Sequence, residues 1–164
     1  MPIEEKNKVL ALLDEMQISY QVTNHPAVFT IEEVYRLQIE PMDKVVKNLF
    51  IRDDKKRNYY LVVMKGDKSA NLKELRRQIG SRPLTFASED DLYKYLRLGR
   101  GEVSPLGALN DADKIVTVMI DKELKEYDFI GIHPNDNTAT VYMSVDDLIK
   151  VLDAKGQPIT FVEL

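Results

Sequence analysis

The sequence predicts an α+β fold in which a mixed or largely antiparallel β-sheet is flanked by helices. The chain has 164 residues, of which 44% are hydrophobic and 30% are charged, as is typical of one globular domain. Helical segments with clear ends alternate irregularly with short strands, and two pairs of strands adjoin as in hairpins. This irregular order favours antiparallel neighbours over a doubly wound parallel sheet. No linker, repeat or low-complexity tract divides the chain, so we expect residues 1–164 to form a single domain.

Helix signals predict five helices. The first carries apolar residues at helical spacing, and the second begins with a capping box of Thr30 and Glu33. Asn71 and Gly80 delimit the third helix, a second capping box opens the fourth at Ser88, and Ser144 opens the fifth. The predicted helices are residues 3–16, 30–37, 71–79, 88–99 (stopping at the glycine) and 144–155.

Strand signals predict eight short strands, rich in β-branched and aromatic residues and bounded by turn residues. Two pairs are separated by polar turns and are therefore expected to be antiparallel hairpins, 45–51 with 59–64 and 129–132 with 138–143. The predicted strands are residues 20–23, 45–51, 59–64, 84–86, 115–120, 129–132, 138–143 and 159–162.

The composition excludes several classes of protein. The chain has no cysteine, which rules out disulfides, thiolate nucleophiles and iron–sulfur clusters, and fits a reducing compartment. His25 and His133 are too far apart in sequence for a helical zinc pair, so we expect no metal. The N-terminal segment is acidic and no long apolar run follows, which predicts a cytoplasmic protein without a membrane partner.

The charge is unevenly distributed along the chain. The net charge of −4 argues against a general nucleic-acid coat. Residues 65–100, however, contain nine Lys or Arg and five Asp or Glu. This basic segment either meets a short stretch of RNA backbone or forms two solvated helix faces.

Two polar residues interrupt an apolar strand at Lys47 and Asn48. Strand alternation places Lys47 on the face of Val45, Leu49 and Ile51, and Asn48 on the opposite face. A lysine in this position either reaches a strand end near the surface or stands in a cleft to meet an anion. A buried asparagine needs hydrogen-bond partners.

Two further segments combine glycine or histidine with turn residues. Residues 99–107 contain three glycines and Pro105, so they form either a stiff loop whose main chain contacts a ligand or a simple connector after a helix. His133 ends a predicted strand, where its imidazole either faces a cleft or is a hydrogen-bonded structural group. His25 precedes Pro26 and should end the first strand.

These segments, in this order, resemble one family. HPAVFTIEE, VVKNLFI, YYLVVMKGD, the GxxxP loop within GRGEVSPLGALND, and GIHPNDNTAT are similar to the YbaK/ProX superfamily of aminoacyl-tRNA editing domains over residues 5–163. The similarity is greatest to the free-standing ProX/PrdX-type Ala-tRNA(Pro) deacylases. It implies the YbaK/ProRS editing-domain fold, with a mixed and partly barrel-like sheet, and metal-independent hydrolysis of Ala-tRNA(Pro) without a cofactor. The partners it implies are the acceptor end of tRNA(Pro) and prolyl-tRNA synthetase.

The resemblance also implies site residues. Lys47 and Asn48 match the family's lysine–asparagine pair, Gly101 and Pro105 match its GxxxP loop, and His133 matches its histidine. Lys47 is expected to hold the phosphate or ribose of the terminal adenosine, while the main chain at Gly101 faces the developing oxyanion. Asn48 and His133 are expected to orient the ester carbonyl or the attacking water, with either His133 or a ribose hydroxyl of the substrate as base.

The remaining assignments concern the pocket and the tRNA. A small cavity would accept alanine and exclude the proline ring. The candidates for its walls, each of which could equally be a core residue, are Val28, Phe29, Val46, Phe50 and Leu106. We assign substrate binding to Val46, Phe29, Phe50, Ser104 and Pro105, and tRNA binding to Arg76, Arg77 and Arg100.

Three alternatives remain open at the level of sequence. A Cys-tRNA(Pro) deacylase of the same superfamily would share these motifs and differ in pocket size. A tRNA-binding or regulatory module would keep the fold without catalysis. Within the deacylase hypothesis, Ser104 could act as nucleophile with His133 as base, in place of a directly attacking water.

Overall fold

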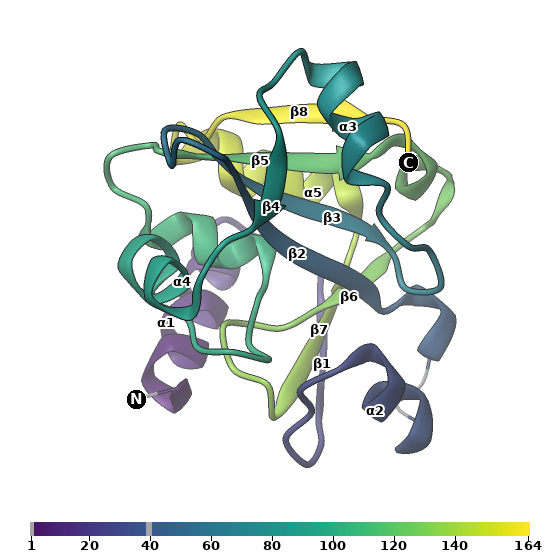
Figure 1. The fold of residues 1–164 in the computed structure, drawn as a ribbon. Coiled ribbons are helices and arrows are strands. Elements are labelled where there is room, and N and C mark those ends of the chain that lie inside the picture. Colours follow the sequence, from purple (N-terminus) through teal and green to yellow (C-terminus); the bar gives the residue numbers. More distant parts are fainter. Residues whose placement is uncertain (1, 39–40) are drawn as a thin grey trace.

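The computed structural model describes residues 2–38 and 41–164, and over these residues eight strands form two sheets (Figure 1). The smaller sheet is antiparallel, with strand order β1-β7-β6, and consists of β1 (Gln21–Asn24), β7 (Ala139–Met143) and β6 (Ile130–Ile132). A single parallel bridge between Val45 and Gly131 joins it to the larger sheet. Over the described residues neither sheet closes into a barrel.

The larger sheet is mixed, with strand order β4-β2-β3-β5-β8. Its antiparallel half is the hairpin of β2 (Val46–Asp53) and β3 (Tyr59–Lys65), together with the short edge strand β4 (Leu84–Phe86). Its parallel half adds β5 (Val116–Asp121) beside β3, and β8 (Ile159–Val162) beside β5. Strand β4 pairs only with the second half of β2, so the first half of β2 is an open edge on that side.

Helices cover both faces of the larger sheet. On one face, α1 (Pro2–Glu15), α4 (Glu89–Leu96) and α5 (Val145–Ala154) pack their apolar residues into the main core. On the other face, α3 (Leu72–Ile79) covers a second apolar cluster. The short α2 (Ile31–Arg36) packs Val34 into a third cluster near the bridge between the sheets.

The predicted mixed sheet with flanking helices is confirmed, and so are both hairpins. Each predicted helix and strand exists, with most ends shifted by one or two residues. The helix predicted to stop at Gly99 already ends at Leu96, because Arg97 adopts the left-handed conformation (φ 58°) that terminates it. Within residues 2–38 and 41–164, three short 3-10 helices are additional: η1 (Met42–Lys44), η2 (Pro105–Asn110) and η3 (Lys122–Glu126).

The predicted helix starts are held by the expected side chains. Asn71, Ser88 and Ser144 each accept a hydrogen bond from the main-chain N–H three residues later. Thr30 caps α2 in the same way, by accepting from Glu33 N at 3.1 Å. The Glu33 carboxylate does not return to Thr30, as a capping box would require, but accepts from the N–H of Phe29 at 3.0 Å. None of the described helices is both long and apolar enough to cross a membrane.

Candidate active site

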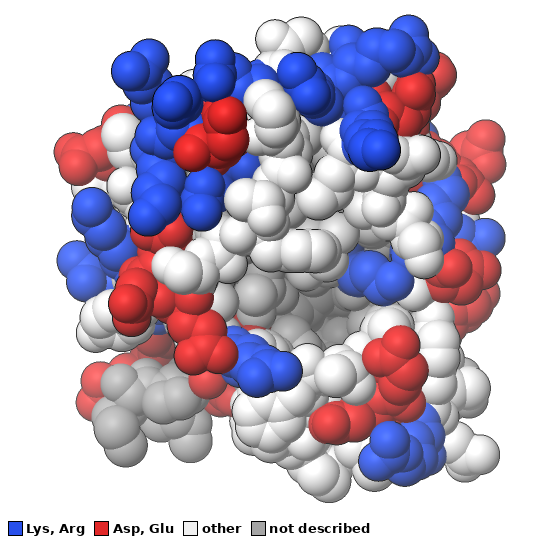
Figure 2. All heavy atoms as spheres, viewed as in Figure 1, with Lys and Arg blue, Asp and Glu red and all other residues white. Residues whose placement is uncertain are grey.

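A cavity of about 350 Å³ opens where α2, the first half of β2, the loop before η2 and the end of β6 meet. It corresponds to the hollow near the centre of the surface in Figure 2. Apolar residues and a few polar ones share its wall, and the polar side chains come from chain segments far apart in sequence. The lining consists of Phe29, Thr30, Ile31, Glu32, Val34, Val45, Val46, Lys47, Asn48, Leu49, Gly101, Val103 and His133.

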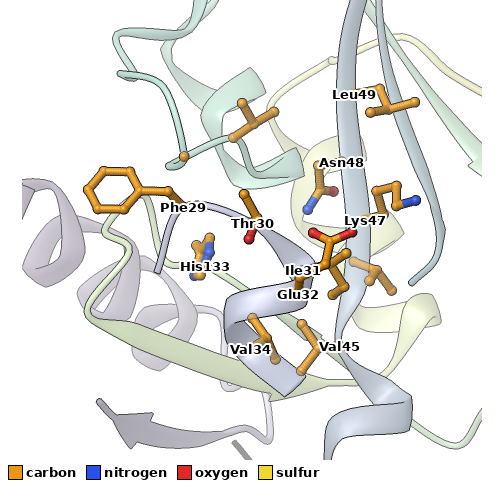
Figure 3. Close-up of a pocket in the computed structure, with 13 residues that line it drawn as sticks. Phe29, Thr30, Ile31, Glu32, Val34, Val45, Lys47, Asn48, Leu49 and His133 are labelled. Atoms are coloured by element: carbon orange, nitrogen blue, oxygen red, sulfur yellow. The ribbon is translucent and has the colours of Figure 1, made fainter. Parts of the chain in front are cut away.

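Strand β2 presents Lys47 and Asn48 to opposite sides of its open edge. Asn48 points toward His133 and Thr30, whereas Lys47 and Leu49 point the other way (Figure 3). This agrees with the predicted alternation, because Phe50 joins the main core and Ile51 joins the cluster under α3. A substrate in the cavity therefore meets an amide on one side of the strand and an ammonium group on the other.

The Lys47 ammonium group is held by a main-chain carbonyl. Its Nζ donates to the carbonyl oxygen of Lys68 at 2.6 Å. The Lys68 side chain is itself fixed, because its Nζ donates to the buried Asp121 carboxylate at 2.7 Å, to the Leu164 carbonyl at 2.7 Å and to Glu123. Burial opposes the charge of Lys68, but the bonds to Asp121 and Glu123 outweigh it and raise the pKa of Lys68.

Asn48 has an unused acceptor. Its side-chain oxygen is buried, and none of the residues that the structure describes donates a hydrogen bond to it. A buried carbonyl oxygen without a donor costs about 1 to 3 kcal/mol. A ligand with an N–H or O–H group in this cavity would remove that cost.

Gly101 is required by its contact with Phe29. A Cβ on Gly101 would lie 2.5 Å from Phe29 Cδ1 and 2.9 Å from Phe29 Cα, and its φ of +83° disfavours any other residue. Because Glu33 anchors the N–H of Phe29, the start of α2 and the glycine loop form adjoining parts of one wall. The loop main chain can therefore approach a ligand closely.

His133 is a neutral imidazole with an available lone pair. Its Nδ1 lies 3.0 Å from the Ala139 carbonyl, which can only accept, so Nδ1 carries the proton and Nε2 is the acceptor. Burial lowers the pKa of His133, and the bond to Ala139 opposes this shift only in part. His133 can therefore accept a proton from a water or hydroxyl at neutral pH.

His25 lies near His133 but does not line the cavity. Its Nδ1 lies 2.8 Å from the Pro26 carbonyl, and its Nε2 lies 2.8 Å from the hydroxyl of the buried Thr140. The two imidazole rings are 6.3 Å apart between centroids. As predicted, β1 ends immediately before His25.

The structure brings together only some of the predicted site residues. The four predicted catalytic residues line the cavity, as do Val46 and Phe29, which were predicted to bind substrate. The other three substrate-binding predictions, Phe50, Ser104 and Pro105, are buried and lie outside the lining. The suggested wall residues Val28 and Leu106 also lie outside it, in the apolar clusters.

Ser104 acts in the structure as a helix cap. Its Oγ donates to the His133 main-chain carbonyl at 2.5 Å and accepts from Leu106 N at 3.2 Å. The side chain is fully buried and does not reach the His133 ring nitrogens by any of these bonds. This arrangement favours an attacking water over the serine nucleophile.

The predicted tRNA-binding arginines lie on different parts of the molecule. Arg76 and Arg77 sit on α3 and line one shallow hollow with Lys73, Gly80 and Ser81. Arg100 lies after α4, which is distant from α3 in Figure 1. Some of these charges are already paired, Arg77 with Glu74, and Arg100 with Glu89 at 3.9 Å. The basic segment is thus not a single continuous patch.

Several lining residues were missed by the sequence analysis. Thr30 caps α2, and Ile31, Glu32 and Val34 lie within it; the first three belong to the HPAVFTIEE motif, but none was assigned to the site. Val45, Leu49 and Val103 lie within the recognised motifs, beside the residues that were assigned to the site, and this position in the motifs was the signal that could have found them. Within the described ranges, no three His, Asp or Glu side chains gather as they would around a metal ion.

Comparisons with known proteins identify the family to which the chain is similar. A family model described as an aminoacyl-tRNA editing domain matches residues 25–151, which include all four predicted catalytic residues. The prolyl-tRNA editing protein ProX of Acetoanaerobium sticklandii is 48% identical over the full length of both chains. A prolyl-tRNA synthetase associated domain-containing protein of Danio rerio is 34% identical over 93% of this chain and 83% of its own.

A solved structure shows the same fold. It belongs to a protein described as a candidate trans-editing enzyme for prolyl tRNA synthetase, and it superposes with a TM-score of 0.73. The match covers 98% of this chain and 97% of that chain, at 18% sequence identity. The architecture described above is therefore shared with the structures of this kind of protein.

Proposed function

The chain belongs to the aminoacyl-tRNA editing domain family, and from that premise we propose that it is a deacylase that hydrolyses mischarged tRNA(Pro) in trans. The observation that carries this proposal is the convergence of Lys47, Asn48, Gly101 and His133 on one cavity of about 350 Å³. The relative with 48% identity over its whole length, a prolyl-tRNA editing protein, supports tRNA(Pro) as the carrier.

The bond broken is the ester between the amino acid and a ribose hydroxyl of the terminal adenosine. Water adds its oxygen to the ester carbonyl carbon, the ribose oxygen leaves, and the water proton passes to that ribose oxygen. In this proposal the main chain at Gly101, which lines the cavity, faces the oxygen that becomes negative, and a side chain there would displace the neighbouring Phe29. Stabilisation of this charge, more than covalent catalysis, is the chemistry that the cavity offers.

His133 is suited to move the proton. Its Nε2 lone pair is available at neutral pH because Nδ1 is committed to Ala139 and burial keeps the ring uncharged. A vicinal ribose hydroxyl of the substrate is the competing base. The unused oxygen of Asn48 would accept a hydrogen bond from the ammonium group of the amino acid.

Lys47 would bind the nucleotide side of the ester. It lies across the strand edge from Asn48 (Figure 3). In the proposed complex it would therefore face the phosphate or ribose, while the amino acid would lie toward His133. A lysine ammonium group is a compact charge suited to a phosphate.

We further propose alanine as the amino acid that is removed. The apolar part of the wall consists largely of Val34, Val45, Val46 and Ile31, with Phe29 held against Gly101. A methyl side chain fits against such a wall. A proline ring is bulkier, and its binding would require the packed valines to move. Cysteine is only slightly larger than alanine and is the competing substrate.

The test is single-turnover hydrolysis of Ala-tRNA(Pro), Cys-tRNA(Pro), Pro-tRNA(Pro) and Ala-tRNA(Ala) under identical conditions. We expect rapid loss of alanine from tRNA(Pro) only, and Lys47→Ala should slow it greatly while leaving the melting temperature unchanged. Faster hydrolysis of the cysteinyl ester would replace alanine by cysteine. Binding of tRNA without hydrolysis of any ester would contradict the deacylase and leave a regulatory module.

Prolyl-tRNA synthetase is the proposed source of the substrate, since it would produce the mischarged tRNA(Pro). A direct complex with this enzyme is a separate question, which sedimentation of the two proteins with and without tRNA(Pro) would answer. A complex that forms only with tRNA would indicate hand-over of the substrate.

A further inference from the structure

One aromatic side chain at the edge of the larger sheet has no cover. Phe86 ends the edge strand β4, and its side chain is 59% exposed. The strand is anchored to β2 there, because Phe86 lies opposite Ile51 and the N–H of Ala87 donates to the Phe50 carbonyl at 3.0 Å. The ring is therefore held in place by a fixed backbone, although it packs little.

Phe86 shares a face of the sheet with the rim of the active site. Residues directly opposite in an antiparallel pair point to the same side, so Phe86 shares the face of Ile51. Leu49 and Lys47 occupy this face of β2 as well, two and four residues before Ile51. Both line the cavity, and Leu49 is the diagonal neighbour of Phe86. Leu49 and Phe86 thus form a short apolar surface, called here the apolar step, which begins at the mouth of the cavity.

The step lies where a bound nucleotide strand would leave the cavity. In the proposed complex the amino acid lies on the Asn48 side of β2 and the terminal nucleotide lies on the Lys47 side (Figure 3). A strand that continues on the Lys47 side passes over Leu49 and Phe86. Beyond the uncharged surface next to the hollow, Lys and Arg gather along the upper edge of Figure 2, over α3 and the turn between β2 and β3.

The basic residues beyond the step favour an anionic partner. The turn between β2 and β3 contributes the exposed Lys55, Lys56 and Arg57, and α3 contributes Lys73 and Arg76. Phosphates attract such side chains, whereas bases stack on aromatic rings irrespective of sequence. An apolar step between a nucleotide pocket and basic residues matches a single-stranded nucleic acid.

We propose that Phe86 is a stacking platform for the unpaired base next to the terminal aminoacyl adenosine, in the single-stranded 3′ end of the substrate tRNA. Leu49 supports the same base from the cavity side. This inference rests on the proposed function, which it extends from the terminal nucleotide to its neighbour. The site accepts any base, because an aromatic ring stacks on the face of the base and does not read its edge.

The test compares two alanyl esters, one on full-length tRNA(Pro) and one on adenosine alone. Phe86→Ala should raise KM for the tRNA ester by roughly 5- to 150-fold, the range that one stacked base is worth. It should leave hydrolysis of alanyl-adenosine unchanged, because that ester has no neighbouring base. Phe86→Trp should restore the KM for the tRNA ester.

The matched control is Tyr93→Ala. Tyr93 is an equally exposed aromatic residue (61%) on α4 and does not line the cavity, so its loss should change neither KM. An equal rise in KM for both esters in Phe86→Ala, or an unchanged KM for the tRNA ester, would overturn the proposal. A change of oligomeric state in Phe86→Ala with unchanged KM would also overturn it and would assign the ring to a protein contact. Failure of the proposed function can be distinguished from failure of this inference, because the unaltered protein would then hydrolyse neither ester.

Discussion

At the scale of single residues, the site depends on two positions where chemistry and packing coincide. Gly101 leaves room for Phe29, and both residues line the cavity. His133 gives up one ring nitrogen to the backbone and thereby keeps the other as an acceptor. Each position allows a test that separates its local role from general stability.

Gly101→Ala should lower the free energy of unfolding by more than backbone strain alone would. An alanine in the left-handed conformation costs about 1 to 2 kcal/mol. At Gly101 the added methyl would also meet Phe29 at 2.5 Å, which adds about 1 to 3 kcal/mol of overpacking. Deacylation should fall at least about ten-fold, because Phe29 must move. The measurements are urea unfolding and single-turnover rates.

Gly80 provides the control for Gly101. It has φ +64° and no atom within 4 Å of an added Cβ, so Gly80→Ala tests strain without overpacking. Equal unfolding free energies and equal rates for the two variants would contradict the role of Phe29 as the neighbour that requires Gly101.

His133 should make the protein less stable in mild acid. Its pKa is lowered by burial, so the unfolded chain binds this proton more readily than the folded protein. Stability due to His133 is therefore constant above the ordinary pKa of about 6.5 and falls as the pH drops below it. His133→Gln should lose less stability between pH 7 and pH 5 than the unaltered protein.

The same shift predicts the pH profile of the reaction. If His133 Nε2 takes the proton, deacylation should remain constant through pH 6.5 and decline only at lower pH, where the buried ring becomes charged. Histidine ring signals in NMR spectra, assigned with His133→Gln, would report the titration directly. A ring that titrates above pH 6.5 would be incompatible with this interpretation.

At the scale of elements, Lys47 lies at the start of β2, and the segment after β3 holds its ammonium group. Lys68 contributes its carbonyl to Lys47 and its side chain to Asp121 at the end of β5 and Glu123 in η3. The pKa of Glu123 is lowered because Lys68 bonds to it. Because Lys68 does not line the cavity, we expect it to be a positioning residue that acts through Lys47.

Lys68→Met should reduce kcat/KM roughly ten-fold, a change of about 1.4 kcal/mol, because the carbonyl that holds Lys47 loses its anchor. The informative measurement is the double-mutant cycle with Lys47→Ala. In the Lys47→Ala background, Lys68→Met should change the rate by less than about two-fold, since the interaction is already absent.

Lys65→Met is the matched control for Lys68. Lys65 also reaches Glu123, at 3.8 Å, but does not hold Lys47. It should leave kcat/KM within about two-fold of the unaltered protein. Fully additive effects of Lys47→Ala and Lys68→Met would show that Lys68 acts on stability alone.

At the scale of the whole molecule, the acidic protein carries a local cluster of positive charge. The net charge is −4, but the exposed Lys73, Arg76 and Arg77 lie together on or beside one hollow at α3. Binding of a polyanion at this surface should weaken with added salt, because each neutralised phosphate releases counterions.

Arg76→Ala with Arg77→Ala should make deacylation of Ala-tRNA(Pro) less sensitive to salt. The slope of log kcat/KM against log salt should become shallower by about 1 for each phosphate that the double variant no longer neutralises. Lys8→Ala on α1, on a different part of the molecule in Figure 1, should leave the slope unchanged. An unaltered slope in the arginine double variant would remove α3 from the RNA interface.

Much of this architecture follows from local patterns in the sequence. Asn71 and Gly80 delimit α3, Ser88 and Ser144 begin α4 and α5, and both hairpins occur where apolar strands flank polar turns. Lys47, Asn48, Gly101 and His133 stand out by motif, and they meet in one cavity. The caps, the turns and the motifs each depend on a few residues that are neighbours in sequence, so one amino-acid sequence is sufficient to recognise them.

Other features depend on residues that are distant in sequence. Phe50 has the apolar character of a wall residue, yet the pairing of β2 turns it into the main core, while Leu49 lines the cavity. Ser104 has a nucleophile's hydroxyl, yet the His133 carbonyl engages it. Arg97 ends α4 before the glycine that the pattern indicates, because the chain turns there into the left-handed conformation.

The sequence by itself determined the kind of elements, their order and the residue types that carry the chemistry, because caps, periodicity and motifs act over short distances. Only the tertiary structure decided that α2 forms part of the cavity wall, that the Lys68 carbonyl holds Lys47, and that Phe86 is the diagonal neighbour of Leu49 in the cavity lining. The physical reason is that strand pairing and packing join segments that lie far apart along the chain. No short-range pattern encodes which side chains such contacts expose and which they bury.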